Sequence, residues 1–307
     1  VSFLFLAIGL QMARQYILTK FPVRQGDQES AKLTPGYQKE YSDRRHRLYN
    51  PSLEEILSNP VPFDALIGAD GALKGYGSMS HRAATLGHDP VLGLIFGTAN
   101  IATATLTNSS FESYHIYTNE AKRDWFRGKA RTELVLGRTA EKLLYGGKEG
   151  RQIVACSLVK EIIHLRSDLY TKRSLPLPFV SQIDPKLPST LASYGLDMAN
   201  LVTVSKQASY ATLINTLIAM VHGLFFDGNS DIERKLHEVR TRKILSYSNL
   251  VASTANLAVV AATEKAQLLD LGGIAVTIYR VITDAKFIRQ VKEEFIFGSY
   301  RKMIMGK

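Results

Sequence analysis

Two side chains near the middle of the chain have the types and the spacing that suit metal binding. His164 and Asp168 are four residues apart in a segment with helical periodicity, so they should share one face of a helix. An imidazole and a carboxylate in that relation can ligate one metal ion, or the carboxylate can orient the imidazole. The same spacing is also common in exposed polar pairs, so the pattern alone leaves both interpretations open.

A second group of polar side chains lies in the segment SHRAATLGHDP. His81 and His88 are seven residues apart there, and Arg82 follows the first of them. The imidazoles could ligate a metal ion, and the guanidinium could hold a phosphate oxygen through two hydrogen bonds. Asp89 has two interpretations: an oxygen ligand, or the cap of a helix that starts at Pro90.

Taken in order, these motifs resemble those of the bacterial membrane-bound, metal-dependent hydrolases that prophages often carry. That family has an Asp-rich segment, then an HRG-x-THS-like motif, then an HLLLD-x-x-T-like motif. The His-x-x-x-Asp element is also similar to one in all-α zinc-dependent phospholipases C. The resemblance covers residues 64–179, and the counterparts in this chain are Asp64 or Asp70, then His81, Arg82, Thr85 and His88, then His164, Asp168 and Thr171.

The resemblance implies a hydrolase with one or two divalent metal ions, for which zinc is the expected identity. The water bound to such an ion would attack an anionic ester or phosphoester. Arg82 and Asp70 would take catalytic roles. The expected metal ligands are His81, His88, His164, Asp168 and Asp64. This hypothesis requires the two histidine clusters to lie within about 5 Å of each other, because metal–ligand distances are about 2 Å.

The alternative hypothesis is a non-catalytic helical protein of a membrane or of a mobile-element system. In that case the small-residue helices pack with one another or with partner chains. The residues from His81 to Asp89, and the His164–Asp168 pair, are then loop and cap residues. Clusters that lie far apart in the fold would favour this second hypothesis.

Composition limits the classes of protein and partner. The chain has 307 residues, 45% of them hydrophobic, and a single cysteine, Cys156. These values exclude a disordered chain and a disulfide framework. The formal net charge of +10 favours an anionic substrate or a negatively charged membrane surface. Nucleic acid and further copies of the chain remain open as partners.

Periodicity predicts an all-α fold: a helical bundle with an irregular N-terminal arm and apolar helices rich in small residues. A capping box at Ser52 and Glu55 predicts a short helix, and Gly93 and Gly97 would let a second helix approach closely. The apolar face expected for the helix over 153–169 consists of Val154, Leu158, Ile162 and Leu165. Three regions are expected: 1–62, an apolar helix and a basic arm; 63–190, a helical domain with the metal site; and 191–307, a C-terminal helical region packed on the same core.

Several apolar stretches are long enough to cross a membrane, but their composition is mixed. Residues 207–226 and 244–263 carry no Asp, Glu, Lys or Arg, and the first of these is the better candidate for a span. The second contains several Ser, Thr and Asn side chains, which suit a packed helical interior equally well. The apolar N-terminal stretch over 1–12 fits a core helix, an interfacial anchor or part of a transmembrane segment. Membrane and cytoplasm therefore both remain open as locations.

Overall fold

The computed structural model describes residues 2–17, 24–26, 29–30, 32–35, 49–63, 79–119, 124–172 and 174–306. Over this part of the chain the fold is all-α, with one small three-stranded sheet. The chain divides into two compact units, and each is described by itself. Unit 1 comprises Val1–Phe21 and Leu201–Lys307, and unit 2 comprises Pro22–Asn200.

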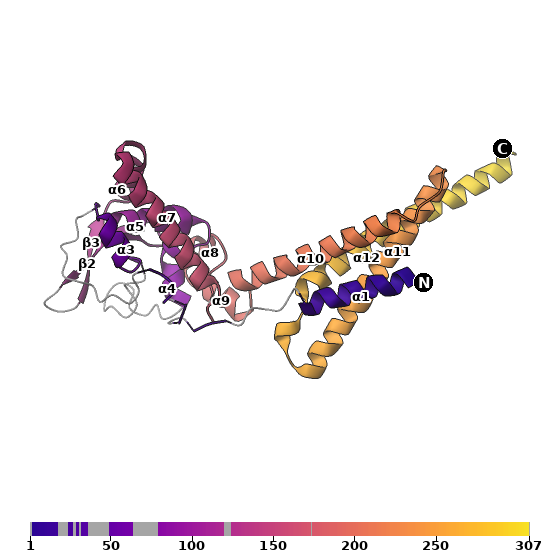
Figure 1. Ribbon diagram of the computed structural model, residues 1–307, viewed down its shortest axis with the longest axis horizontal. Coiled ribbons are helices and arrows are strands. Elements are labelled where there is room, and N and C mark those ends of the chain that lie inside the picture. The colour runs from indigo at the N-terminus through magenta and orange to yellow at the C-terminus, as the bar shows by residue number, and fades with distance from the viewer. Residues whose placement is uncertain are drawn as a thin grey trace. The chain divides into compact units, whose positions relative to one another are not determined.

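Unit 2 is built around two packed helices, α5 and α7 (Figure 1). The other helices of the unit and an antiparallel sheet of order β1-β2-β3 accompany this pair. Its elements are α3 (Leu53–Ser58), α4 (Met79–Ala84), η1 (Leu86–His88), α5 (Leu92–Thr103), β1 (Thr105–Thr107), β2 (Ser113–Asn119), β3 (Asp124–Ala130), α6 (Thr132–Tyr145), α7 (Gly147–Leu169), α8 (Val180–Ile183) and α9 (Leu187–Ser193).

Local sequence signals account for the ends of the helices in unit 2. The Ser52 hydroxyl accepts from the Glu55 backbone N–H and the Glu55 carboxylate accepts from Ser52 N–H, so the predicted capping box is confirmed. Asp89 Oδ1 accepts hydrogen bonds from the backbone N–H groups of Val91 and Leu92, each at 2.9 Å. The Asp89 side chain therefore binds the backbone at the start of α5, which agrees with a structural role, but α5 begins at Leu92 with Val91 at its N-cap, two residues later than predicted.

The α5–α7 contact depends on glycine. A Cβ atom on Gly97 would overlap the Glu161 carboxyl group of α7, and one on Gly93 would lie 3.0 Å from Glu161 Oε1. The close helix approach predicted from Gly93 and Gly97 is thus confirmed. An apolar cluster lies beside this contact and contains Ile56, Val61, Phe63, Ile101, Ala102, Leu106, Ile116 and Ile153.

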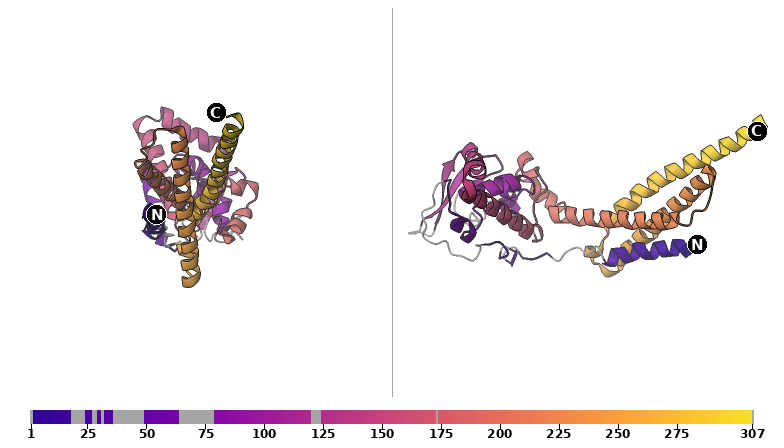
Figure 2. Two further views of the ribbon diagram at one scale, coloured as in Figure 1. Left: turned by 90° about the vertical axis from the view of Figure 1, so that its right-hand side faces the viewer. Right: turned by 45° about the horizontal axis from the view of Figure 1, so that its top comes forward.

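Unit 1 contains long helices that run beside one another (Figure 2). They are α1 (Ser2–Ile17), α10 (Met198–Gly223, of which all but the first three residues belong to unit 1), α11 (Asp231–Thr263) and α12 (Leu271–Met305), with the short η2 (Ala266–Leu268) before α12. From the sequence, the first apolar helix was expected to form one region, 1–62, with the basic arm. In the structure α1 contacts α11 of the C-terminal region.

One helix of the described residues is long and apolar enough to cross a membrane, and it is α11. The sequence instead favoured 207–226 as the span. However, α10 ends at Gly223, and the polar residues in the first half of this helix lower its mean hydropathy. Length and composition do not separate a membrane span from a core helix of a soluble protein. Only 33% of the apolar window of α11 is buried, however.

Candidate metal centre

Three metal-ligating side chains meet in the interior of unit 2. They are His88 at the end of η1, and His164 and Asp168 on α7. One ligand atom from each lies within 4.8 Å of the other two, and the three residues are 0%, 1% and 6% exposed. The convergence that the hydrolase hypothesis requires is therefore present for these three residues.

The spacing of the donor atoms suits a metal ion. Asp168 Oδ2 lies 3.5 Å from His88 Nε2 and 3.5 Å from His164 Nε2. These distances exceed the usual length of an N–H···O hydrogen bond. Two ligands of a tetrahedral zinc ion, each about 2.0–2.2 Å from the metal, are about 3.3–3.6 Å apart. The group could therefore hold a metal ion.

Each donor is oriented by a second contact. His88 Nδ1 lies 2.7 Å from the Thr85 hydroxyl. When Nδ1 carries the proton it donates to Thr85, and the Nε2 lone pair then faces Asp168. The Nδ1 atom of His164 faces the buried carboxylate of Glu161, with Oε2 at 3.7 Å. Such outer partners fix the ring and its tautomer in protein metal sites.

Arg82 holds the third donor in place. Its Nη2 donates to Asp168 Oδ1 at 3.0 Å, and its Nη1 donates to the Thr171 hydroxyl at 2.6 Å and the Ser174 carbonyl at 2.8 Å. Since Oδ1 accepts from Arg82, Oδ2 is the oxygen that faces the two histidines. In this arrangement Arg82 is a positioning residue for Asp168, whereas the sequence suggested a direct contact with substrate.

An aromatic ring closes one side of the group. The fully buried ring of Phe63 has its centroid 5.2 Å from that of His88 and 5.1 Å from that of His164. Gly87 allows this approach, because a Cβ atom there would lie 2.7 Å from the Phe63 ring. The apolar wall lowers the local dielectric and strengthens the electrostatic interactions among the polar groups.

The remaining predicted site residues are placed as follows. Asp64 and Asp70 lie outside the described residues, and so does the side chain of His81, whose backbone is in α4. Asp89 uses both carboxylate oxygens on backbone N–H groups, including that of Phe179 at 2.6 Å.

The sequence missed Glu161 and predicted the buried face of α7 only in part: Val154 and Leu165 of the expected apolar face are buried. Leu158 and Ile162 were expected on that face, but they are 38% and 48% exposed. The buried side chains include Ser157, Lys160, Glu161, His164 and Asp168. Ser157, Glu161, His164 and Asp168 follow one another at spacings of four, three and four, which is a helical stripe and a signal available in the sequence.

The chain has no match among family models, curated proteins or solved structures in the three comparisons that we made. Function must therefore be inferred from the geometry and chemistry of the site itself.

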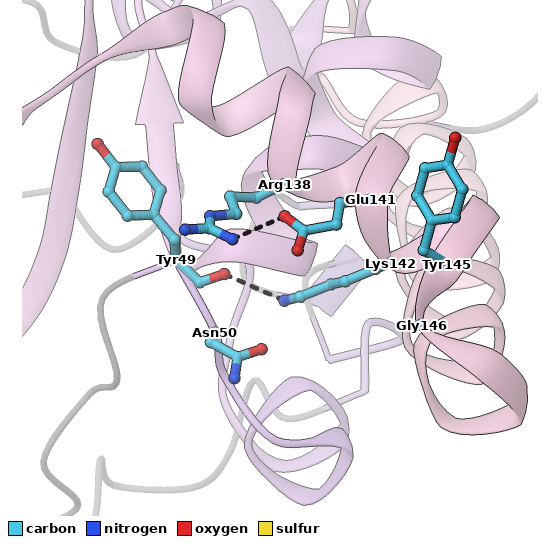
Figure 3. A pocket seen from close by; sticks show the side chains of 7 residues that line it. All are labelled: Tyr49, Asn50, Arg138, Glu141, Lys142, Tyr145 and Gly146. Atoms are coloured by element: carbon cyan, nitrogen blue, oxygen red, sulfur yellow. Dashed lines mark hydrogen bonds and ion pairs between the residues drawn. The ribbon is translucent and has the colours of Figure 1, made fainter.

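A pocket of about 380 Å³ lies at α6 and contains none of the three metal-ligating residues (Figure 3). Lys142 extends into it and donates to the carbonyl oxygens of Tyr49, at 3.1 Å, and Ala102, at 2.7 Å. Arg138 pairs with Glu141 at the rim. The pKa of Lys142 is lowered to about 8, mainly because the ammonium group is buried; the charge of Arg138 also lowers it, whereas that of Glu141 raises it.

The lowered pKa of Lys142 predicts a pH dependence of stability. Between pH 8 and 10.5 the folded chain has lost the Lys142 proton and the unfolded chain still binds it, so the free energy of unfolding should rise with pH in this window. Urea unfolding at steps from pH 7.5 to 10 would measure the rise. The Lys142→Met chain should show a smaller slope, and an equal slope in both chains would contradict the assignment.

Proposed function

We propose that unit 2 is a metal-dependent hydrolase that acts on an anionic ester or phosphoester, with zinc as the ion. The observation that carries the proposal is the convergence of His88 Nε2, His164 Nε2 and Asp168 Oδ2. Two histidines and one carboxylate form a donor set used by catalytic zinc sites, which keep a fourth position for water. A zinc ion there would supply a bound water that ionises near neutral pH.

The residues of the chain have separable roles in this proposal. His88, His164 and Asp168 bind the ion. Thr85 and Glu161 would hold the proton on the far nitrogen of each imidazole, and Arg82 keeps Asp168 turned toward the histidines. Phe63 excludes water from one side. His81, Asp64 and Asp70 stay predicted members of the site, and the net charge of +10 favours an anionic substrate.

Metal content and hydrolysis, measured together, test the proposal. We expect the full chain, purified without chelators, to contain about one zinc ion and to hydrolyse bis(4-nitrophenyl) phosphate or 4-nitrophenyl acetate. Stripping with dipicolinate should reduce hydrolysis to the rate in buffer, and zinc should restore it. Adding manganese or magnesium to the stripped chain, in place of zinc, shows which ion supports hydrolysis.

Two outcomes would overturn the proposal. A chain without metal would remove its basis. A chain that binds zinc, unfolds on stripping and hydrolyses neither ester would contain a structural ion in a non-catalytic helical protein, which is the alternative hypothesis.

A further inference from the structure

Unit 1 has large apolar side chains on its outer surface, and they are present on all four long helices. Examples are Phe5 on α1, Leu213 on α10, Leu250 on α11 and Ile278 on α12, which are 67%, 52%, 47% and 57% exposed. A docking site for one protein partner is normally a single contiguous patch. Apolar side chains on every helix instead indicate an apolar surrounding.

The interior of unit 1 is unusually polar. The Gln11 amide donates to Asn215 Oδ1 at 2.9 Å, and Asn249 donates to the same oxygen at 2.6 Å. Arg14 forms an ion pair with Asp270, and both side chains are 1% exposed. Among the described residues of this unit, the fully buried apolar cluster consists of Ala7, Ile218 and Leu245, with four partly buried apolar side chains packed against it.

Further polar contacts join the helices across the interior. Ser253 of α11 and Thr277 of α12 share a hydrogen bond of 2.8 Å. The Gln207 side chain accepts from Gly272 N–H and donates to the Leu269 carbonyl. Polar side chains that face the inside of a helical bundle and bond to one another, with apolar side chains outside, are the pattern of helices in lipid.

We infer that unit 1 is embedded in a lipid bilayer, with its apolar outer surface in contact with the acyl chains. The inference uses unit 1 alone and does not depend on metal binding or hydrolysis in unit 2. The apolar stretch of α11 from Ile244 to Thr263 is about 20 residues long. At 1.5 Å per residue it spans about 30 Å, the thickness of the hydrocarbon core of a bilayer.

The charges of unit 1 also fit a bilayer with anionic headgroups. Arg240, Arg242 and Lys243 directly precede the apolar stretch of α11. The ion pair of Arg242 with Asp284, at 3.0 Å, brings this end of α11 next to the part of α12 where further basic residues follow. The connection between α11 and α12 at the other end, residues 264–270, has Lys265 as its single basic residue. Arg14, which pairs with Asp270, and Lys206 also lie toward the 264–270 end, but more of the basic residues of unit 1 lie at the Arg242 end, which favours contact with anionic lipids there.

Quenching of tryptophan fluorescence by brominated lipid tests the inference directly. The chain has one tryptophan, Trp125. The test therefore starts from the Trp125→Phe chain, in which the introduced tryptophan is the one that emits. Leu250→Trp and Ile278→Trp are then introduced one at a time, and each full chain is reconstituted into vesicles of phosphatidylcholine and phosphatidylglycerol. Replacing the phosphatidylcholine with its form brominated deep in the acyl chains should lower the emission of both variants at least twofold.

Ile232→Trp is the matched control. Ile232 is 55% exposed and lies in the charged first turns of α11, before the apolar stretch, so deep bromine atoms should leave its emission unchanged. The inference fails if Leu250→Trp and Ile278→Trp are not quenched. It fails equally if the wild-type chain stays in solution as a defined oligomer when the vesicles are floated, because copies of the chain would then cover the apolar surface.

Discussion

The His164→Ala chain should contain less than about a tenth of the zinc found in the wild-type chain. His164 supplies one of three converging donors. Loss of an outer partner alone lowers metal affinity by about 10- to 100-fold, so loss of a donor atom should cost more. Elemental mass spectrometry of chelator-free preparations measures the zinc content, and hydrolysis should fall with it.

A graded series of variants separates the site from general damage to the fold. Glu161→Gln removes the charge that faces His164 Nδ1 and should weaken zinc binding by about 10- to 100-fold while all three donors remain. His115→Ala is the matched control, because His115 is a buried histidine of the same unit that packs on Tyr49. Full zinc content in His164→Ala, or equal loss in His115→Ala, would refute the assignment of the donors.

Replacing Arg82 by leucine should destabilise unit 2 by about 3–5 kcal/mol, even without metal. The change removes the guanidinium that pairs with the buried Asp168 carboxylate, and breaking a buried ion pair by removing one partner is strongly destabilising. It also removes two hydrogen bonds to Thr171 and Ser174. Urea unfolding of the full chain in excess chelator, followed by the fluorescence of Trp125 in β3, reports on unit 2.

Arg138→Leu is the control for the Arg82 variant. Arg138 also pairs with a carboxylate, but the side chains of Arg138 and Glu141 are 53% and 55% exposed. Exposed ion pairs contribute about 0–1 kcal/mol, so this chain should unfold close to the wild-type urea concentration. Similar losses in the two variants would show that Arg82 does not anchor α7.

The helical part of the fold could be predicted because its signals are local. The capping box at Ser52 and the periodicity over 153–169 each predicted a helix that the structure contains. The sheet was not predicted. β2 has a single aliphatic residue, Ile116, among polar and aromatic ones such as Tyr114 and His115, so the repeated alternation of apolar and polar residues that reveals a half-buried strand is missing.

The site could be predicted only in part, for a related reason. His164 and Asp168 share a helix face, so their spacing is sufficient to pair them. His88 joins them through contacts between residues distant in sequence. Phe63 packs on both imidazoles, and Arg82 bonds to Asp168, which is 86 residues further along the chain. No local pattern encodes such contacts. Glu161 was not predicted because it lies on a buried polar stripe of α7, which apolar periodicity does not reveal.

The position of His88 relative to α7 has a consequence for the lifetime of the protein. An ion held by His88, His164 and Asp168 would join η1 to α7, and so would act as a cross-link that the unfolded chain lacks. At a free concentration 100 times its dissociation constant, such an ion adds about 2.7 kcal/mol to stability. Metal starvation would then remove the protein through proteolysis as well as through lost chemistry, which couples its abundance to the metal supply of the cell.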